Sequence, residues 1–193
     1  DPNYRTPIAK LDEENQHYFR VSYGVGVDAT FPTLLYFQGE LDDIRWQDQL
    51  SSFFYGFKFL DSLFSEVVDT YFTLGYLAHY ASEAQNFGNE YVAAFKIYWN
   101  FYWPTHTRLG FAEGLSYTDE VSSTEITDIE EQNQMNSSEF ANYLDVSFDI
   151  NVGELFNGSK AWQGLWLGYG LHHRSGLYRG AGQFGRIRGG VNY

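Results

Sequence analysis

The stretch YVAAFKIYWN, residues 91–100, decides the fold. Its apolar side chains recur at every second position, so that Phe95 and Ile97 share one face while Lys96 lies on the other. Successive side chains of a β-strand point to opposite faces, and this spacing therefore predicts a strand with one apolar and one polar face.

The same alternation returns in six other segments, each close to the roughly 9–11 residues that a tilted membrane strand needs. In these segments Phe, Tyr, Leu and Val gather on one face, and Gly, Lys, Arg and Asp gather on the other. That division is unusual for a soluble β-sandwich and usual for a membrane barrel. We therefore predict an all-β fold, an up-and-down antiparallel transmembrane β-barrel of about eight strands. The six segments span residues 18–28, 52–59, 72–80, 108–117, 144–151 and 165–172.

Composition narrows the class of protein. A chain of 193 residues predicts a single domain, here 1–193, and its aromatic content of 20% suits a barrel with aromatic girdles. The absence of Cys excludes a disulfide framework, a thiolate metal site and a cysteine nucleophile. The formal net charge of −13 argues against nucleic-acid binding, which needs a basic face.

Acidic residues cluster at Glu40, Asp42 and Asp43 and again across residues 119–131. Such runs are usually solvated loops. The sharper interpretation places them among divalent cations and lipopolysaccharide head groups at a cell surface. We expect no cofactor other than such cations, and we expect membrane lipid, lipopolysaccharide and proteins of an envelope complex as partners.

Connection lengths predict the orientation, because outer-membrane barrels have short periplasmic turns and long external loops. The connections at 29–50 and 118–140 are long and predict external loops. Those at 61–69 and 103–105 are short and predict periplasmic turns, and residues 1–16 then form a periplasmic N-terminal segment. The expected location is the outer membrane of a Gram-negative bacterium, after cleavage of a signal peptide that this chain does not contain.

Residues 186–193 are short for a complete eighth strand, so we expect the printed sequence to stop before that strand is complete. The segment 34–43 is left unassigned, as either a short strand or a helix. A barrel of eight strands leaves an interior just wide enough for side chains, and we therefore expect no open pore.

Charged residues on the polar parity are expected to pair inside the barrel, because buried charges need partners. We also expect His172 and Arg174 to join this interior network. Four bases, Arg20, Lys58, Lys96 and Arg108, are predicted to pair with the acids Asp145 and Asp149.

A polar pair interrupts the apolar face of the 165–172 segment as it continues toward Leu177. His173 and Ser175 are two residues apart, so their side chains share one side, which is the minimum arrangement for a base-activated serine. Glu113 and Asn142 lie on the lipid-facing parity of the two preceding predicted strands, one residue on each. Glu113 is two strands away from His173, which corresponds to about 10 Å at normal strand spacing. The alternative is that all four residues merely meet lipid head groups.

The stretch from Gly168 to Leu177 resembles the His-x-Ser motif of the lipid A 3-O-deacylases, outer-membrane barrels with catalytic residues on the membrane-facing wall. That resemblance implies Ser175 as nucleophile and His173 as general base. In those enzymes an Asn follows the serine and a Glu on the next strand orients the histidine, whereas here Gly176 follows and no acid occurs after it. The oxyanion donor and third triad member are thus absent from their expected places.

A closer resemblance is to a family of uncharacterised proteobacterial outer-membrane proteins, and it implies the fold without an activity. It covers the C-terminal half of the chain. The motifs that carry it are Glu113-Gly-Leu-Ser-Tyr117, Asn142-Tyr-Leu-Asp145, His173-Arg-Ser-Gly176 and Gly189-Gly-Val-Asn192.

Three functions are compatible with these features. The first is a barrel without an open pore that is structural or a subunit of an envelope assembly. The second is a serine-dependent hydrolase of acyl esters in lipid A or phospholipid, and the third, disfavoured by the crowded interior, is a channel for small solutes. His17, His79 and His106 lie on different segments, so we expect no zinc site.

Overall fold

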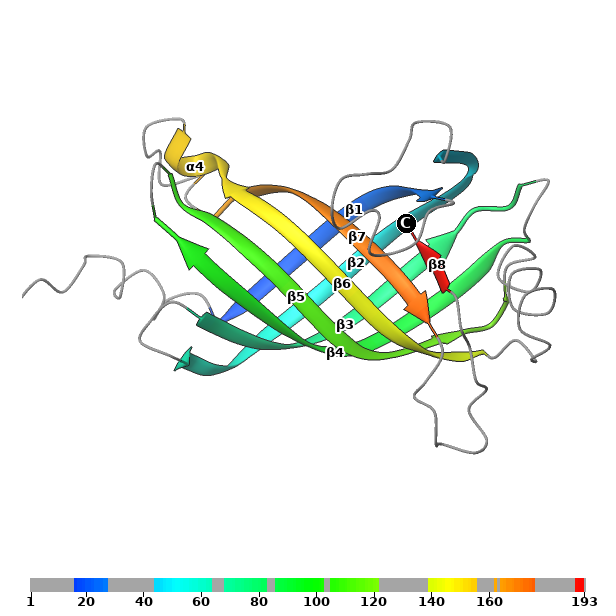
Figure 1. Cartoon of the computed structure of the whole chain (residues 1–193), viewed down its shortest axis with the longest axis horizontal. Helices are drawn as coiled ribbons and strands as arrows, with labels where there is room; N and C mark the ends of the chain where they lie inside the picture. Colours follow the sequence, from blue (N-terminus) through cyan, green and yellow to red (C-terminus); the bar gives the residue numbers. More distant parts are fainter. Residues whose placement is uncertain are drawn as a thin grey trace, which may run out of the picture.

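A single antiparallel sheet curls into a barrel in the computed structural model (Figure 1). The structure describes residues 16–27, 44–63, 68–82, 86–102, 105–121, 139–155, 162, 164–175 and 190–192. Their elements are β1 (His17–Val27), β2 (Ile44–Leu63), β3 (Val68–His79), β4 (Gly88–Phe101), β5 (Thr107–Thr118), β6 (Phe140–Asn151), α4 (Val152–Leu155), β7 (Trp166–Ser175) and β8 (Gly190–Asn192).

Each strand pairs with the next one along the chain, in the order β1 to β8, which is the up-and-down topology expected from the sequence. The ring closes through β8, a strand of three residues. β8 pairs with β7 at three positions and with β1 at one, where Asn192 lies opposite Val27. The prediction of an all-β antiparallel barrel of eight strands is thereby confirmed, with a short last strand.

The connections divide between the two ends of the barrel (Figure 1). One end carries the chain between β1 and β2, β3 and β4, β5 and β6, and β7 and β8. The other end carries the remaining links, among them α4. The long connection between Thr118 and Phe140 lies where it was predicted, but the link between β3 and β4 at that same end is short. Length therefore follows the expected alternation only in part.

The predicted loop 29–50 is too long, because β2 begins at Ile44. The sequence RWQDQ at 45–49 is mostly polar and lacks the apolar alternation by which the other strands were identified. Asp48 and Leu50 nevertheless face the interior and are buried there. The pairing register with β1 shifts at this point, between Val25 and Gly26, which is a second departure from a regular strand.

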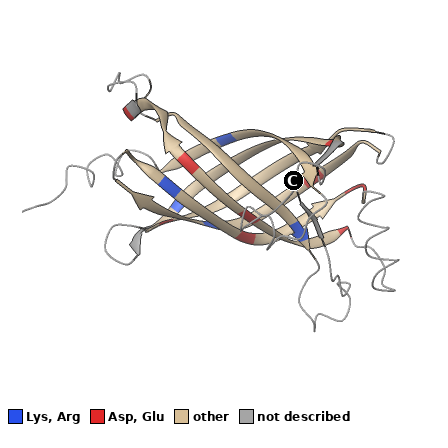
Figure 2. Ribbon diagram, turned by 45° about the horizontal axis from the view of Figure 1, so that its top comes forward, with Lys and Arg blue, Asp and Glu red and all other residues tan. Residues whose placement is uncertain are grey.

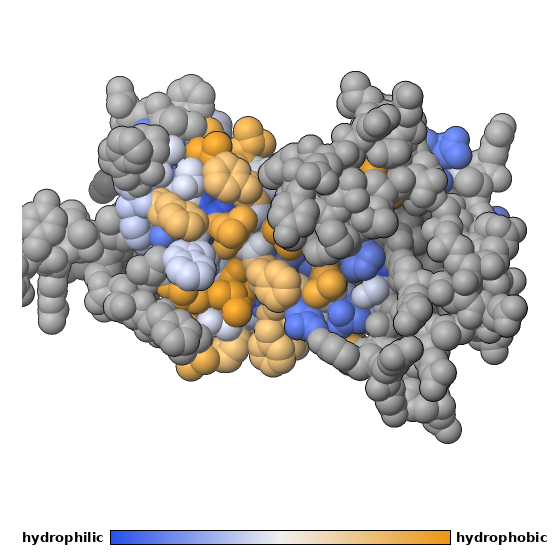
Figure 3. All heavy atoms as spheres, viewed as in Figure 1, coloured by the Kyte–Doolittle hydropathy of each residue, from blue (hydrophilic) through white to orange (hydrophobic). Residues whose placement is uncertain are grey.

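Burial follows the predicted parity of two. In β4 every second residue is buried, from Gly88 through Lys96 to Asn100, and the residues between them are exposed, or half-buried at Asn89. Apolar and aromatic side chains therefore cover the outside, and they gather over the middle of the wall in Figure 3. One row of rings crosses four strands in register, through Tyr76, Tyr91, Tyr117 and Phe140.

Inside, large rings are paired with glycine across neighbouring strands. Tyr18 lies opposite Gly56 and Phe54 lies opposite Gly75. A Cβ added at Gly56 would come within 1.9 Å of the Tyr18 ring, and one at Gly75 within 2.2 Å of the Phe54 ring. These glycines are needed for close approach, since only a residue without a side chain leaves room for the facing ring.

Candidate functional site

The middle of the lumen is organised around Asp145, which is buried. Arg20 binds both of its carboxylate oxygens, with Nη2 to Oδ2 at 2.7 Å and Nη1 to Oδ1 at 3.1 Å. Lys96 donates to Oδ1 of the same carboxylate. One acid thus binds two cations from strands far apart in the sequence, as expected for a barrel that must pair what it buries.

A second layer lies toward the end of the barrel that carries α4. Arg108 donates to Asp149 at 2.8 Å, and its guanidinium lies over the rings of Tyr98 and Trp166 at 3.9 and 4.1 Å. Lys58 was expected to pair with Asp145 or Asp149, and that expectation is wrong. Its Nζ lies 3.1 Å from Asp69, because β2 and β3 are neighbours.

A third layer, toward the other end, is centred on Glu90, which is fully buried. His79 Nε2 lies 2.8 Å from Glu90 Oε2, and the Ser116 hydroxyl donates to Oε1 at 2.5 Å. Arg174 donates to Ser116 at 3.0 Å, and His172 Nε2 lies 3.5 Å from the same Oε2. His172 and Arg174 are therefore inside, on the predicted parity.

The sequence analysis did not identify three further inward-facing acids, Glu90, Asp69 and Asp48. Each could have been found by continuing the inward-facing alternation of its strand toward the N-terminus. Among the described residues, five acids and five bases face the lumen, so their formal charges cancel. Figure 2 shows these charges distributed along the strands. The acids are Asp48, Asp69, Glu90, Asp145 and Asp149, and the bases are Arg20, Lys58, Lys96, Arg108 and Arg174.

Side chains also pack across the end of the barrel near α4. The His106 ring lies 4.5 Å from Tyr102 and 4.7 Å from Trp166, between centroids. Glu154 of α4 accepts a hydrogen bond from the His106 backbone at 2.9 Å. This packing ties α4 and the start of β7 to the connection between β4 and β5.

The outer wall carries the four polar residues that the sequence singled out. Glu113, Asn142, His173 and Ser175 are all partly exposed on the outward parity of β5, β6 and β7. Ser175 lies directly opposite Asn142 in the pairing of β6 with β7. Leu144 pairs with Glu113 on one side and with His173 on the other.

The register therefore separates Glu113 from His173 by the whole width of β6. Two strand spacings amount to about 10 Å, as the sequence predicted. Asn142, by contrast, is one strand from Ser175. The structure thus pairs Asn142 with Ser175, with His173 two residues away on the same face and Glu113 on the strand beyond β6.

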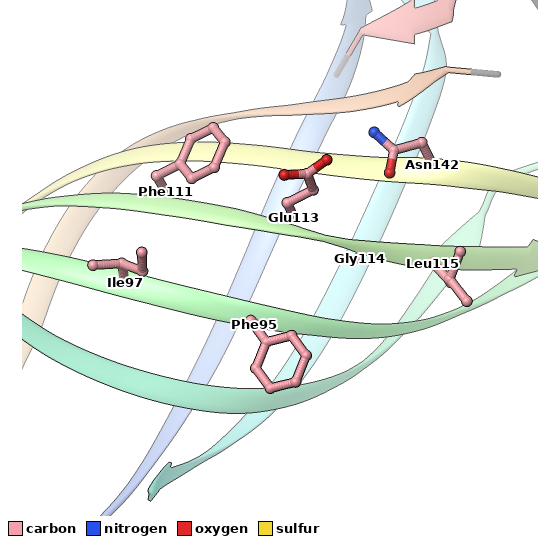
Figure 4. A pocket seen from close by; sticks show the side chains of 7 residues that line it. All are labelled: Phe95, Ile97, Phe111, Glu113, Gly114, Leu115 and Asn142. Atoms are coloured by element: carbon pink, nitrogen blue, oxygen red, sulfur yellow. The ribbon is translucent and has the colours of Figure 1, made fainter. Parts of the chain in front are cut away.

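Glu113 and Asn142 share a shallow groove of about 390 Å³ on the outer wall. Figure 4 shows the two polar side chains extending toward each other above an apolar floor. Gly114 lies at the base of this groove, where an added Cβ would come within 2.2 Å of the Ala93 carbonyl oxygen. The other lining residues are Phe95, Ile97, Phe111 and Leu115.

In the part of the chain that the structure describes, no group of three His, Asp or Glu side chains is arranged to hold a metal ion. His17 stacks on Tyr55, His79 binds Glu90 and His106 packs near α4, so these three lie in separate places.

No helix among the described residues combines the length and apolar character needed to cross a membrane.

The acidic runs are described only in part, since Glu40, Asp42, Asp43 and residues 122–131 lie outside the described residues. Asp119 accepts hydrogen bonds from the Asn89 side chain at 2.7 Å and the Asn89 backbone at 2.6 Å. These two bonds, the side-chain one first, lower the pKa of the Asp119 carboxyl. Glu120 accepts a bond from Asn86 at 2.8 Å, so both acids link two neighbouring connections.

Comparison with known proteins finds no matching family model, no matching curated protein and no matching solved structure.

Proposed function

We propose that the protein is an integral outer-membrane β-barrel without an open pore, which acts as a structural element of the cell envelope or as a subunit of an envelope assembly. One observation carries the proposal: the distribution of polarity is that of a soluble protein turned inside out. Rows of Phe, Tyr, Leu and Val are exposed outside, while charged side chains are buried inside.

Water would disfavour this exterior, because soluble proteins rarely expose contiguous apolar patches larger than a few hundred Å². Lipid favours it, since an apolar band bordered by aromatic rings matches the hydrocarbon core and its interfaces. Strands in a closed ring also satisfy the backbone groups that lipid cannot bind. Bacterial single-chain barrels of the outer membrane have an even number of antiparallel strands, from eight upward, and this fold matches that pattern.

The crowded lumen favours a barrel that does not conduct ions or small solutes. Three layers of paired charges cross the interior, and Tyr18, Phe54, Tyr98 and Tyr143 fill the space between them. An eight-stranded barrel has room for side chains and not for a water column as well. A channel for small solutes is accordingly the weakest of the three functions.

Conductance tests this part of the proposal. We expect the purified protein, inserted into planar lipid bilayers, to give no stepwise conductance, because buried side chains fill the described part of the lumen around Asp145. A porin inserted under the same conditions is the positive control. Regular single-channel steps from the native sequence would overturn the sealed barrel, whereas recovery of the protein in the soluble fraction would overturn the membrane location.

A second candidate, hydrolysis of acyl esters in lipid A or phospholipid, is favoured by one local arrangement. Ser175, its partner Asn142 and His173 lie together on the outward face, where an acyl chain would lie if that face meets lipid. A serine with a nearby base and an amide donor has the parts for acyl transfer. The register counts against it, because Glu113 lies two strands from His173 rather than on a neighbouring strand.

Substitution separates the two candidates. If Ser175 is a nucleophile, Ser175→Ala and His173→Asn should each lower the rate of fatty-acid release by several orders of magnitude while leaving the folded barrel unchanged. Glu113→Gln should reduce release only if that carboxylate reaches the histidine through Asn142. The measurement is release of fatty acid from lipid A and from phospholipid vesicles with divalent ions present. No release by the native sequence would remove the hydrolase and leave the structural role.

A further inference from the structure

The described charges of the lumen balance as a whole, but they do not balance layer by layer. Around Asp145 one carboxylate meets two cations, Arg20 and Lys96. Toward α4 the pairs are one to one, since each cation there has an acid of its own. The middle of the lumen therefore holds one more positive charge than its acids can match.

The acid that restores the overall count lies toward the other end of the barrel. The described lumen there holds two acids, Asp48 and Glu90, and one Arg or Lys side chain, Arg174. Asp48 is the fifth residue of β2 and Glu90 is the third of β4, so both are close to the ends of their strands. Because Coulomb attraction weakens with separation, these acids are poor partners for a cation in the middle.

Hydrogen-bond donors are in surplus in the same place. In the described part of the chain, the buried hydroxyls of Tyr98 and Ser147 and the Nε of Arg20 have no hydrogen-bond partner. The guanidinium can only donate, and each hydroxyl has a proton to donate. Burying a donor without an acceptor is unfavourable. The middle of the lumen thus lacks both an acceptor and a negative charge.

Three of the donor side chains converge over Gly110. Tyr98 of β4 and Ser147 of β6 lie opposite Gly110 on its two sides. A Cβ added at Gly110 would come within 2.8 Å of Tyr98 Cε1 and 2.9 Å of Lys96 Cε, and closer still to Ser147 Oγ. Cε1 adjoins the ring carbon that carries the hydroxyl, and Lys96 Cε carries Nζ. Two hydroxyls and an ammonium group therefore end near one point on the lumen side of β5.

The surroundings of this point favour negative charge. The Arg108 guanidinium lies over the Tyr98 ring at 3.9 Å and brings a second cation close to it. Glycines flank Ser147 on both sides, since Gly110 lies opposite it on β5 and Gly170 on β7. Neither neighbour places a side chain of its own beside the Ser147 hydroxyl, which leaves room for a small ligand.

We infer that the lumen binds one small anion, chloride or another halide, where Lys96, Tyr98 and Ser147 converge. The anion accepts hydrogen bonds from the two hydroxyls and the ammonium, and it supplies the negative charge that the middle layer lacks. A water molecule would satisfy the hydroxyls and leave the charge unmatched. The site is formed by side chains inside the barrel, so it does not depend on which solvent the outer wall meets.

Replacing chloride tests the site through stability. The full chain is unfolded in urea while chloride is exchanged for gluconate, a much larger anion, at constant ionic strength. An ion that binds the folded state alone stabilises it by mass action, so the folding equilibrium constant should rise about tenfold per tenfold increase in chloride above the Kd. Lys96→Met leaves Arg20 and Asp145 as a balanced pair and should abolish that rise. An equal rise in the native protein and in Lys96→Met, or no rise in either, would overturn the inference.

Two serine substitutions separate the hydroxyl contact from the charge. Ser147→Ala should shift the chloride dependence to higher concentration, because it removes one donor and keeps every charge. Ser52→Ala is the matched control, since Ser52 is also a buried, inward-facing serine and its hydroxyl bonds Ser22. It should leave the chloride dependence unchanged. Identical chloride dependence in the two variants would contradict a contact between the anion and Ser147.

Bromide locates the anion directly, because its anomalous X-ray scattering distinguishes it from water. In crystals of the full chain grown with bromide, we expect one anomalous peak within hydrogen-bond distance of Lys96 Nζ and Ser147 Oγ. A water molecule at that point, or bromide bound solely elsewhere, would overturn the site. Neither result would bear on the proposal that the barrel lies in a membrane.

Discussion

At the scale of single residues, the charge of Asp145 matters more than its size. It holds two cations, Arg20 and Lys96, in a lumen that offers them little water. A buried ion pair adds little over an apolar pair of the same shape, but a buried charge that loses its partner is strongly destabilising. The carboxylate is thus required because the cations are present.

Asp145→Asn should therefore destabilise the barrel by about 3–5 kcal/mol, since it leaves two cations without a countercharge. The measurement is urea unfolding in lipid vesicles, followed by tryptophan fluorescence. Asp145→Asn combined with Lys96→Met is the control, because it removes one of the two stranded charges. We expect the double variant to recover part of the loss, and a double variant less stable than Asp145→Asn alone would contradict the account of this layer.

At the scale of the strand, the sequence predicted which side of the sheet a side chain faces better than it predicted which residue that side chain binds. Parity is local, because every second residue shares a face whatever lies beside the strand, and so Lys96 and Asp145 were placed inside correctly. Pairing is not local. That Lys58 binds Asp69, and that Leu144 stands between Glu113 and His173, depend on register, which the alternation alone leaves open.

The start of β2 shows the other limit of sequence reading. Residues 45–49 carry almost no apolar signal, and the strand forms there because β1 offers an edge to pair with. The partners of Glu90 likewise come from other strands and could not be read from its own segment. Glu90 is the next inward position before Val92 on β4, and its partners His79, Ser116 and Arg174 come from three other strands.

Position along a strand should decide the cost of a charge on the outer wall. Ile97 lies well within β4 and Phe101 ends it, and both side chains are exposed. In a membrane, Ile97→Arg should cost about 2–4 kcal/mol and Phe101→Arg about 0–1 kcal/mol, because the cost falls from the midplane to the interface. The measurement is reversible unfolding into urea from lipid vesicles. In water neither exposed substitution should matter, so equal and small effects would contradict the membrane location.

At the scale of the whole molecule, the negative net charge of the chain does not come from the lumen. The chain carries a formal charge of −13, yet the described lumen charges cancel. By sequence, most of the excess acids belong to the connections and the N-terminal segment, whereas Glu113 lies on the outer wall. A lumen whose described charges balance and an exterior lined with apolar side chains fit the proposal of a barrel that stays in a membrane and conducts nothing.

The most direct test of this account asks which solvent the outer wall meets. A nitroxide spin label is attached to a single cysteine at Phe95, on the outward face of β4, and in a second variant at Glu120, in an exposed connection. Collision rates with oxygen, which concentrates in lipid, and with a water-soluble nickel complex are then measured in reconstituted vesicles. The account predicts that the Phe95 label collides with oxygen and is shielded from nickel, while the Glu120 label shows the reverse. A Phe95 label as accessible to nickel as the Glu120 label would contradict the proposal that this barrel spans a membrane.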